Sequence, residues 1–504
     1  MQVGDIRFIA YPDAVHYGEA GEQAATRGKK AINQLLWGDY TKVLALDGNW
    51  IKVSARGRSG WVRRERLQEN RLLEVNFVDI GQGDGCHIQT PDDRALVIDA
   101  GEGDNMYRFL RWRFGQFARQ FTFENFIISH PDSDHYYGFR HLFEDGNVYV
   151  EKLFHNGLVE QKLGGKKTLG AEARIGRARY VTGLVRTLAE LKAVTDDDGR
   201  RAAYWYPNML KLAADSGRIG DICGVLAPSD WQDRSYLPGF APGDNRGFCL
   251  RILGPVPSLS AGTAGLPWLG SAGETKNGHS VVLLLEIGNI RMLLGGDLNE
   301  PSQEYLLEHY TGLSAHPRSA DDERLLVEEA RKTFEVDVAK ACHHGSAHVS
   351  PLFLQATNPL ATIISSGDAE PHSHPRPDTL GLVGRFSRGA RPLIFSTELA
   401  RSGNEHIKHP NQVRRELKAK MAAEYRIQHD PLSSAADRQK AEERIEKHLE
   451  VIQRSVANYG MINVRTDGTR MIVAQRLERE RSKAKRWDIY TLEPDDRGRL
   501  EFQH

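Results

Sequence analysis

The sequence contains few cysteines, and none of them forms a closely spaced pair. The four thiols are Cys86, Cys223, Cys249 and Cys342. A disulfide scaffold needs many cysteines in a short chain and a zinc knuckle needs CxxC pairs, so both classes are excluded. Scattered thiols are typical of a protein in a reducing, intracellular compartment.

Net charge and long apolar runs are also missing. Lysine plus arginine and aspartate plus glutamate both number 67, so the formal charge is zero and gives no general attraction to DNA or membranes. Any affinity for nucleic acid must come from a local patch. No apolar run approaches about 18 residues, and the first 20 residues lack the basic start and apolar core of a signal peptide. We therefore expect a cytoplasmic protein with no membrane partner.

What is present is an ordinary globular composition, with 40% hydrophobic and 27% charged residues among 504. This length exceeds one minimal domain. The patterning predicts a small β domain at 1–70, a main domain at 71–475, and a C-terminal strand or tail at 476–504. Within the main domain we expect helical insertions at about 156–222 and 410–457.

The first part alternates polar and apolar residues between turn signals at 47–48 and 58–60. The pattern predicts one small core lined by Trp50, Val53, Trp61 and Val62. A W-x-x-V strand followed by a turn and G-W-V resembles a bacterial SH3-like β-barrel. Such a barrel either binds a protein partner or only packs on the catalytic body, and the sequence leaves both roles open.

The main part contains strands that end in polar clusters and are followed by helices, which predicts a layered α/β or α+β body. The first insertion carries several arginines between 174 and 201 and the run Tyr204-Trp205-Tyr206, and we expect it to be mostly helical. A turn at 467–468 predicts a closing hairpin after the second insertion.

The strongest local signal is the run His130-Pro-Asp132-Ser-Asp134-His135, directly after the apolar strand NFIIS. Alternate residues of a short extended turn can point into one cavity. His130 and Asp132 would then hold one metal ion, and Asp134 and His135 a second. Imidazole and carboxylate suit Zn²⁺, Mn²⁺ or iron. Taken alone, the run also fits a solvated polar loop.

Further polar clusters follow at other strand ends. They are Asn277 and His279 before SVVLLLEI, Asp297 after RMLLGG, His343, His344 and Ser346 after VAKAC, and His374 after ATIISSGDAE. A carboxylate at the end of a buried strand is costly unless a partner compensates it. A purely structural role would explain any one of these clusters. All of them together, in this order, indicate a metal site.

The series DIGQGDG, LVIDAG, SHPDSDH, LLGGD and HHGS resembles the metallo-β-lactamase superfamily, and within it the hydrolase domain of ComEC-type competence proteins and their soluble relatives. The resemblance covers about residues 72–400 and resumes at 459–475. It implies an αββα four-layer sandwich with helical insertions, preceded here by the SH3-like barrel. It also implies a hydrolase with two divalent ions, Zn²⁺ or Mn²⁺.

Carried over by position, the resemblance implies metal ligands at His130, Asp132, Asp134, His135, Asp297 and either His343 or His344. Asp297 would bridge the two ions, and His279 would give the first ion a third imidazole. Asp132 replaces the middle histidine of the common H-x-H-x-D-H form, which favours Mn²⁺ or weakens occupancy. Ser373 stands where the family has a glycine before its histidine.

Other polar residues near these motifs have supporting roles. Asp84 is expected to orient a ligand histidine, Ser346 to hydrogen-bond a phosphate, and Asn277 to lie beside the site. Asp79 and Asp99 are expected only to cap turns and end strands.

The reaction implied by this site is attack of a metal-bridging hydroxide on an ester centre. Asp134 would accept the proton of the water. His374, or whichever of His343 and His344 is not a ligand, would protonate the leaving oxygen or bind the developing charge.

Three functions remain open. The first is a nuclease or phosphodiesterase acting on DNA or RNA, with the arginines and aromatic residues of the first insertion binding a single strand; that insertion also fits a solvated helix pair. The second is hydrolysis of a small ester such as a cyclic nucleotide, a phosphocholine or a lactone. The third is a regulatory module that docks a partner through the SH3-like domain and has a weakened metal site. The intact ligand set favours an enzyme.

Overall fold

The computed structural model describes residues 1–22, 31–81, 83–201, 204–260, 263–367, 373–397, 410–430, 433–454, 460–477 and 480–503. The last residues of the second expected insertion, 455–457, lie outside these ranges. Helices pack on several β-sheets in a mixed α/β arrangement, so the α+β class is confirmed in this coarse form. No helix in the described ranges is long and apolar enough to cross a membrane.

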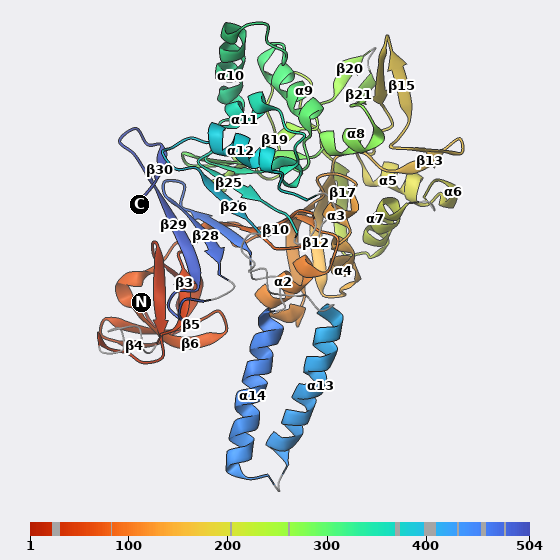
Figure 1. The fold of residues 1–504 in the computed structure, drawn as a ribbon. Coiled ribbons are helices and arrows are strands. Elements are labelled where there is room, and N and C mark those ends of the chain that lie inside the picture. The colour runs from red at the N-terminus through yellow and green to blue at the C-terminus, as the bar shows by residue number, and fades with distance from the viewer. Residues whose placement is uncertain are drawn as a thin grey trace.

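The N-terminal residues form a seven-stranded antiparallel sheet, coloured red to orange at the lower left of Figure 1. In sheet order its strands are β3 (Ala31–Leu36), β2 (Asp13–Tyr17), β6 (Arg58–Arg63), β5 (Trp50–Ala55), β4 (Tyr40–Asp47), β1 (Ile6–Ile9) and β7 (Leu67–Gln68). The turn between β5 and β6 falls at 56–57 and not at 58–60 as expected, because residues 58–60 pair with β5.

The core of this sheet differs in part from the expected one. Val53 and Val62 lie in it, but Trp50 and Trp61 do not. Neighbouring residues of a strand point to opposite faces, so the two tryptophans lie on the face opposite the core. Trp50 packs there against Tyr17, with ring centroids 5.7 Å apart.

A ten-stranded mixed sheet forms one half of the main body. In sheet order its strands are β17 (Ile219–Gly224), β12 (Val148–His155), β11 (Phe121–Ile127), β10 (Ala95–Ala100), β9 (Gly85–Gln89), β8 (Leu73–Phe77), β27 (Ile462–Thr466), β28 (Met471–Arg476), β29 (Trp487–Pro494) and β30 (Leu500–Phe502). β27 and β28 form the hairpin expected around 467–468. The C-terminal strands β29 and β30 extend the same sheet beyond β28.

A second large sheet, of seven strands, forms the other half. In sheet order its strands are β18 (Ser235–Tyr236), β19 (Cys249–Gly254), β22 (Val282–Ile287), β23 (Ile290–Leu294), β24 (Val338–Lys340), β25 (Ala361–Ile364) and β26 (Leu393–Ser396). One continuous core joins the two sheets, since it contains Val75 and Ile98 of the first and Leu283 and Ile363 of the second.

Helices cover the remaining faces of both sheets. On the ten-stranded sheet they are α2 (Asn105–Arg113), α4 (Phe139–Glu144) and α7 (Trp205–Asp215). These helices share a core with Val97 and Phe126 of that sheet. On the second sheet they are α9 (Glu300–Thr311), α10 (Ala320–Phe334), α11 (Pro351–Thr357) and α12 (Pro377–Phe386), which lie above it in Figure 1. Phe334 and Phe353 from these helices belong to the same continuous core cluster as the strands of both sheets.

The first insertion, at about 156–222, is partly β-structure, which corrects the expectation of a mostly helical segment. Its hairpins are β13 (Gln161–Leu163) with β14 (Lys166–Thr168) and β15 (Glu172–Ile175) with β16 (Ala178–Val181). Helices α5 (Leu188–Thr195) and α6 (Asp198–Arg201) follow before α7. The hairpin strands are too short and polar to show a hydrophobic period, so the sequence pattern did not separate them from helices.

The second insertion contains the helices α13 (Pro410–His429) and α14 (Ala435–Arg454). They pack side by side and project away from the sheets in Figure 1, and an ion pair between Arg444 and Glu424 joins them at 3.4 Å. Both helices lie within the range 410–457, where a helical insertion was expected.

The buried side chain of Arg465, on β27, joins the N-terminal sheet to the ten-stranded sheet. Its guanidinium lies 2.8 Å from Asp39 Oδ1 of the N-terminal part and 3.2 Å from Glu74 Oε1 of β8. It also donates to the carbonyl of Trp37 at 2.6 Å. Burial opposes ionisation of both acids, but their arginine partners hold the pKa of each below its usual value. Both carboxylates are therefore charged and depend on these arginines.

Replacing Arg465 with methionine should destabilise the chain, because Asp39 and Glu74 then stay buried without this cation. We expect the free energy of unfolding to fall by about 3–5 kcal/mol, as measured by urea denaturation. Arg481→Met is the matched control, because Arg481 is 67% exposed in its pair with Asp488 and exposed pairs contribute less than about 1 kcal/mol. Equal losses in the two variants would contradict the role given to Arg465.

Candidate metal centre

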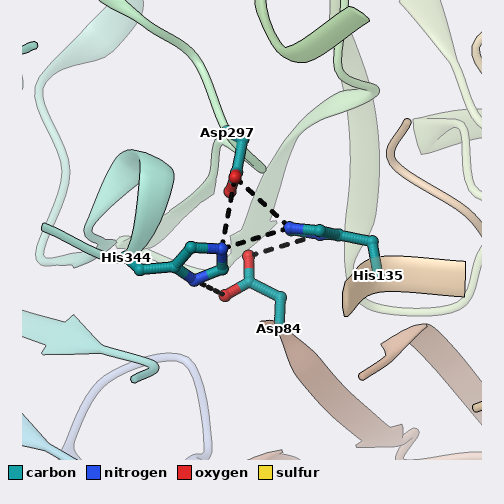
Figure 2. Close-up of side chains that lie close together, drawn as sticks. All are labelled: Asp84, His135, Asp297 and His344. Atoms are coloured by element: carbon teal, nitrogen blue, oxygen red, sulfur yellow. Dashed lines mark hydrogen bonds and ion pairs between the residues drawn. The ribbon is translucent and has the colours of Figure 1, made fainter. Parts of the chain in front are cut away.

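Polar side chains converge where strands of the two large sheets end. β10 and β11 run parallel, as do β23 and β24, so the carboxyl ends within each pair lie at one edge of the sheet. His135, in the short helix α3 (Ser133–Tyr136), follows β11, and Asp297 follows β23. His344 follows β24, and Asp84 directly precedes β9. Figure 2 shows these four side chains pointing toward one another.

Three ligand atoms form a nearly regular triangle, here called the ligand triangle: Asp297 Oδ2, His135 Nε2 and His344 Nε2. Asp297 Oδ2 is 3.2 Å from His344 Nε2 and 3.3 Å from His135 Nε2, and the two nitrogens are 3.3 Å apart. In a tetrahedral Zn²⁺ site with bonds of about 2.0–2.1 Å, neighbouring ligand atoms lie about 3.3–3.4 Å apart. Asp134 Oδ2, 3.5 Å from His344 Nε2, offers a fourth ligand. These residues therefore fit a divalent metal ion.

Asp99 fixes the orientation of His135. Its Oδ2 lies 2.8 Å from His135 Nδ1, and its carboxylate accepts hydrogen bonds from the backbone and hydroxyl of Ser129 at 2.8 and 2.6 Å. The contact leaves Nε2 of the imidazole for the ligand triangle and makes the ring a better ligand. The expectation that Asp99 only ends its strand is therefore wrong. Its φ of 55° departs from strand geometry at a bulge in β10 and places the carboxylate.

His344 is oriented through its other ring nitrogen. Nδ1 lies 3.1 Å from the carbonyl oxygen of Ser365 and 3.2 Å from Asp84 Oδ1. Asp84 thus lies beside a histidine, as expected, and its carboxylate is close enough to the ligand triangle to count as a further ligand. His343 and His344 have φ values of 49° and 54°, and such strained left-handed backbone is typical of functional sites.

A buried lysine that the sequence analysis missed lies behind this group. Lys340 forms an ion pair with Asp84, donates to the carbonyl of Gly296 at 2.9 Å, and lies 3.6 Å from Asp297 Oδ1. Burial opposes its charge, but the two carboxylates raise the pKa of Lys340 above its ordinary value. A lysine in a short apolar strand just before the two histidines is the kind of signal that could have indicated this role.

Gly83 allows the loop that carries Asp84 to approach the metal motif. The backbone N–H of Asp84 donates to the carbonyl of Asp134 at 3.2 Å, and a Cβ on Gly83 would lie 1.7 Å from that oxygen. The φ of Gly83, 100°, is also one that glycine adopts readily and other residues rarely do. The glycine before Asp84 is therefore required for the carboxylate to reach the histidines.

His130 and Asp132 lie beside the ligand triangle and not in it. The ring centroids of His130 and His135 are 4.1 Å apart, and His130 Nε2 is 3.6 Å from Asp132 Oδ2. Asp132 forms an ion pair with Lys276, and the amide of Asn277, oriented to donate, lies 2.7 Å from Asp132 Oδ2. Asp132 thus contacts a lysine and an amide within the described structure.

The structure does not bring His279 into the centre. Its Nε2 lies 2.7 Å from the carbonyl oxygen of Pro267, and the ring is fully buried. Burial lowers the pKa of His279 to about 4, so the ring is neutral at physiological pH. The expected third imidazole of the first metal position is therefore engaged elsewhere.

The remaining expected residues border the ligand triangle. His343 Nε2 is 3.9 Å from Asp297 Oδ2, and the ring of His374 lies 5.7 Å from that of His343. Ser346 is buried in the same turn, and its backbone N–H donates to the carbonyl of His343 at 2.8 Å. Of the two neighbouring histidines, His344 thus contributes to the ligand triangle and His343 lies at its border.

The charges of the ligand triangle depend on one another. Burial opposes ionisation of Asp297, but His344 and His135 hold its pKa well below the usual value. Burial also opposes protonation of the two rings, but Asp297 raises the pKa of each well above the ordinary value. Protons on the rings thus balance the carboxylates, and a divalent cation would replace those protons on binding.

Neither a scan against models of known protein families nor a search of curated proteins finds a match for this chain. The candidate metal centre therefore rests on the geometry and chemistry of the residues themselves.

Replacing Asp99 with asparagine should weaken metal binding, because His135 loses the carboxylate that orients it. We expect the Kd for Zn²⁺ to rise by about 10- to 100-fold, as measured by competition with a chromogenic chelator. Asp93→Asn is the control, because the side chain of Asp93 is 70% exposed in its pair with Arg71. An unchanged Kd in Asp99→Asn would show that the carboxylate does not support the ligand.

Proposed function

We propose that this chain is a metal-dependent hydrolase that cleaves phosphodiester bonds in DNA or RNA. One observation carries the proposal: the edges of the ligand triangle, 3.2 and 3.3 Å long, match the spacing of ligands around a divalent ion. Imidazole and carboxylate ligands admit Zn²⁺ or Mn²⁺.

The surrounding architecture supports the same proposal. Two large sheets share one core, and helices pack on their other faces. This layering suits the αββα sandwich of the metallo-β-lactamase superfamily, with its functional residues at strand ends. We also propose that the seven-stranded N-terminal sheet is an SH3-like barrel.

The chemistry divides between the ion and the residues around it. When bound, the ion would supply Lewis acidity, which polarises a phosphoryl oxygen and makes water more acidic. Asp134, whose side chain is 20% exposed, would then accept a hydrogen bond from the attacking water instead of serving as the fourth ligand. Burial lowers the pKa of His343, so this ring is neutral at physiological pH. It would stabilise developing negative charge by donating a hydrogen bond, and the ring of His374 lies 5.7 Å from it between centroids.

An exposed aromatic surface beside the metal motif favours nucleic acid as the substrate class. Trp205 is 70% exposed, and its ring packs edge-on against Tyr137, which follows the motif, at 5.8 Å between centroids. Arg174 and Arg177 are exposed on the β15–β16 hairpin. Stacking of bases on an indole and contact of arginine with phosphates are the two interactions that hold a single strand.

Incubation of the purified chain with labelled single-stranded DNA, RNA and bis(p-nitrophenyl) phosphate, in Mn²⁺ or Zn²⁺, tests the proposal. We expect metal-dependent cleavage by the wild type and a loss on the order of 100-fold or more in Asp297→Ala, which removes one vertex of the ligand triangle. Asp321→Ala is the matched control, with a side chain 82% exposed. No turnover of any of these substrates by the wild type, or equal turnover by Asp297→Ala, would contradict the proposal.

Replacing Trp205 with alanine distinguishes a nucleic-acid substrate from a small ester. We expect KM for single-stranded DNA to rise by roughly 5- to 150-fold, which corresponds to the loss of about 1–3 kcal/mol of stacking on one base. KM for bis(p-nitrophenyl) phosphate should not change. Trp231→Ala is the control, since Trp231 is also exposed, by 50%. A rise of the same size for both substrates would mean that Trp205 supports the site and does not bind bases.

A further inference from the structure

Lys276 lies where the sequence indicated a first metal ion. It belongs to α8 (Ala272–Gly278), which ends shortly before β22. Its ammonium forms an ion pair with Asp132 and lies 3.2 Å from Glu160 Oε1. Its side chain is 16% exposed. A largely buried ammonium stays charged because carboxylates pair with it, and this pairing also fixes its position.

The expected ligands of that first ion are engaged by other groups. Both carboxylate oxygens of Asp132 have partners, Oδ1 the ammonium of Lys276 and Oδ2 the amide of Asn277 at 2.7 Å. His279 is directed at a backbone carbonyl. His130 is the one remaining expected ligand there, and its Nε2 faces Asp132 Oδ2 at 3.6 Å. Among the described residues, the group of converging ligand atoms contains neither His130 nor Asp132.

A chain of contacts nevertheless links Lys276 to the ligand triangle. The contacts run from its ammonium to Asp132, from Asp132 to His130, and from the ring of His130 to that of His135, 4.1 Å away between centroids. The ammonium of Lys276 therefore lies beside Asp132, one of the residues expected to hold the other ion of a two-metal site.

We propose that the centre holds one divalent ion and that the ammonium of Lys276 replaces the second, providing its positive charge to an anionic phosphoryl oxygen of the substrate. This inference rests on the proposed metal-dependent function. An ammonium has three N–H groups, and Asp132 and Glu160 face two of them, which leaves one for the phosphate. The same fixed charge repels a second metal ion.

Metal analysis of the full chain tests the count. The purified protein is incubated with excess Zn²⁺, freed of unbound metal by gel filtration, and analysed by plasma mass spectrometry. We expect about one ion per chain in the wild type and in Lys276→Arg, which keeps the charge. We expect about two in Lys276→Met, which frees Asp132 Oδ1 to bind a second ion together with His130. Lys166→Met, a change at an exposed lysine, should keep about one. Lys276→Gln repeats the test if the methionine variant does not fold by circular dichroism.

The outcomes separate this inference from the proposed function. No metal in the wild type would overturn both. Two ions in the wild type, or one ion in both neutral variants of Lys276, would overturn the inference and leave the proposed metal centre intact.

With metal limited to one equivalent, KM for bis(p-nitrophenyl) phosphate should rise about tenfold or more in Lys276→Met, because a hydrogen bond to a charged oxygen is lost. An unchanged KM would mean that Lys276 does not contact the substrate.

Discussion

Repulsion between the carboxylates of Asp84, Asp134 and Asp297, which meet at strand ends of two sheets, must be balanced inside the protein. Two like charges 4 Å apart interact by about 4 kcal/mol even at the effective dielectric of a protein surface, and by more in the interior. Lys340 is the fixed part of the compensation, since it is buried and pairs with both Asp84 and Asp297. The two imidazoles of the ligand triangle are the exchangeable part, because their protons can be replaced by a metal ion.

The fold holds those strand ends together. The two large sheets share one continuous core, so residues from β8–β11 and from β23–β24 face each other across it. The loop before β9 can approach the backbone of Asp134 because residue 83 is a glycine. Any Cβ at this position would collide with that backbone. The second charged network, around Arg465, fixes the N-terminal sheet to β8 and β27 of the same ten-stranded sheet. In both networks a buried cation from one element compensates carboxylates from others.

Local patterns in the sequence predicted the strand ends but not the partners across the sheets. The runs around His135, Asp297 and His344 end apolar strands, so their convergence could be expected from strand order alone. The role of Asp99 could not, because it depends on a bulge in β10 that turns the side chain toward His135 in α3. The role of Lys276 could not either, since its partners come from two distant segments. The short hairpins of the first insertion were missed because strands of three or four polar residues carry no hydrophobic period.

The most direct test of the metal centre is an anomalous difference map from crystals of the wild-type chain grown with Zn²⁺ and measured at the zinc absorption edge. We expect one strong peak, about 2.0–2.2 Å from Asp297 Oδ2, His135 Nε2 and His344 Nε2. We expect no second peak beside Asp132, where the refined structure should place the ammonium of Lys276. The absence of a peak within the ligand triangle would contradict the central claim that this cluster of buried charges is a metal centre.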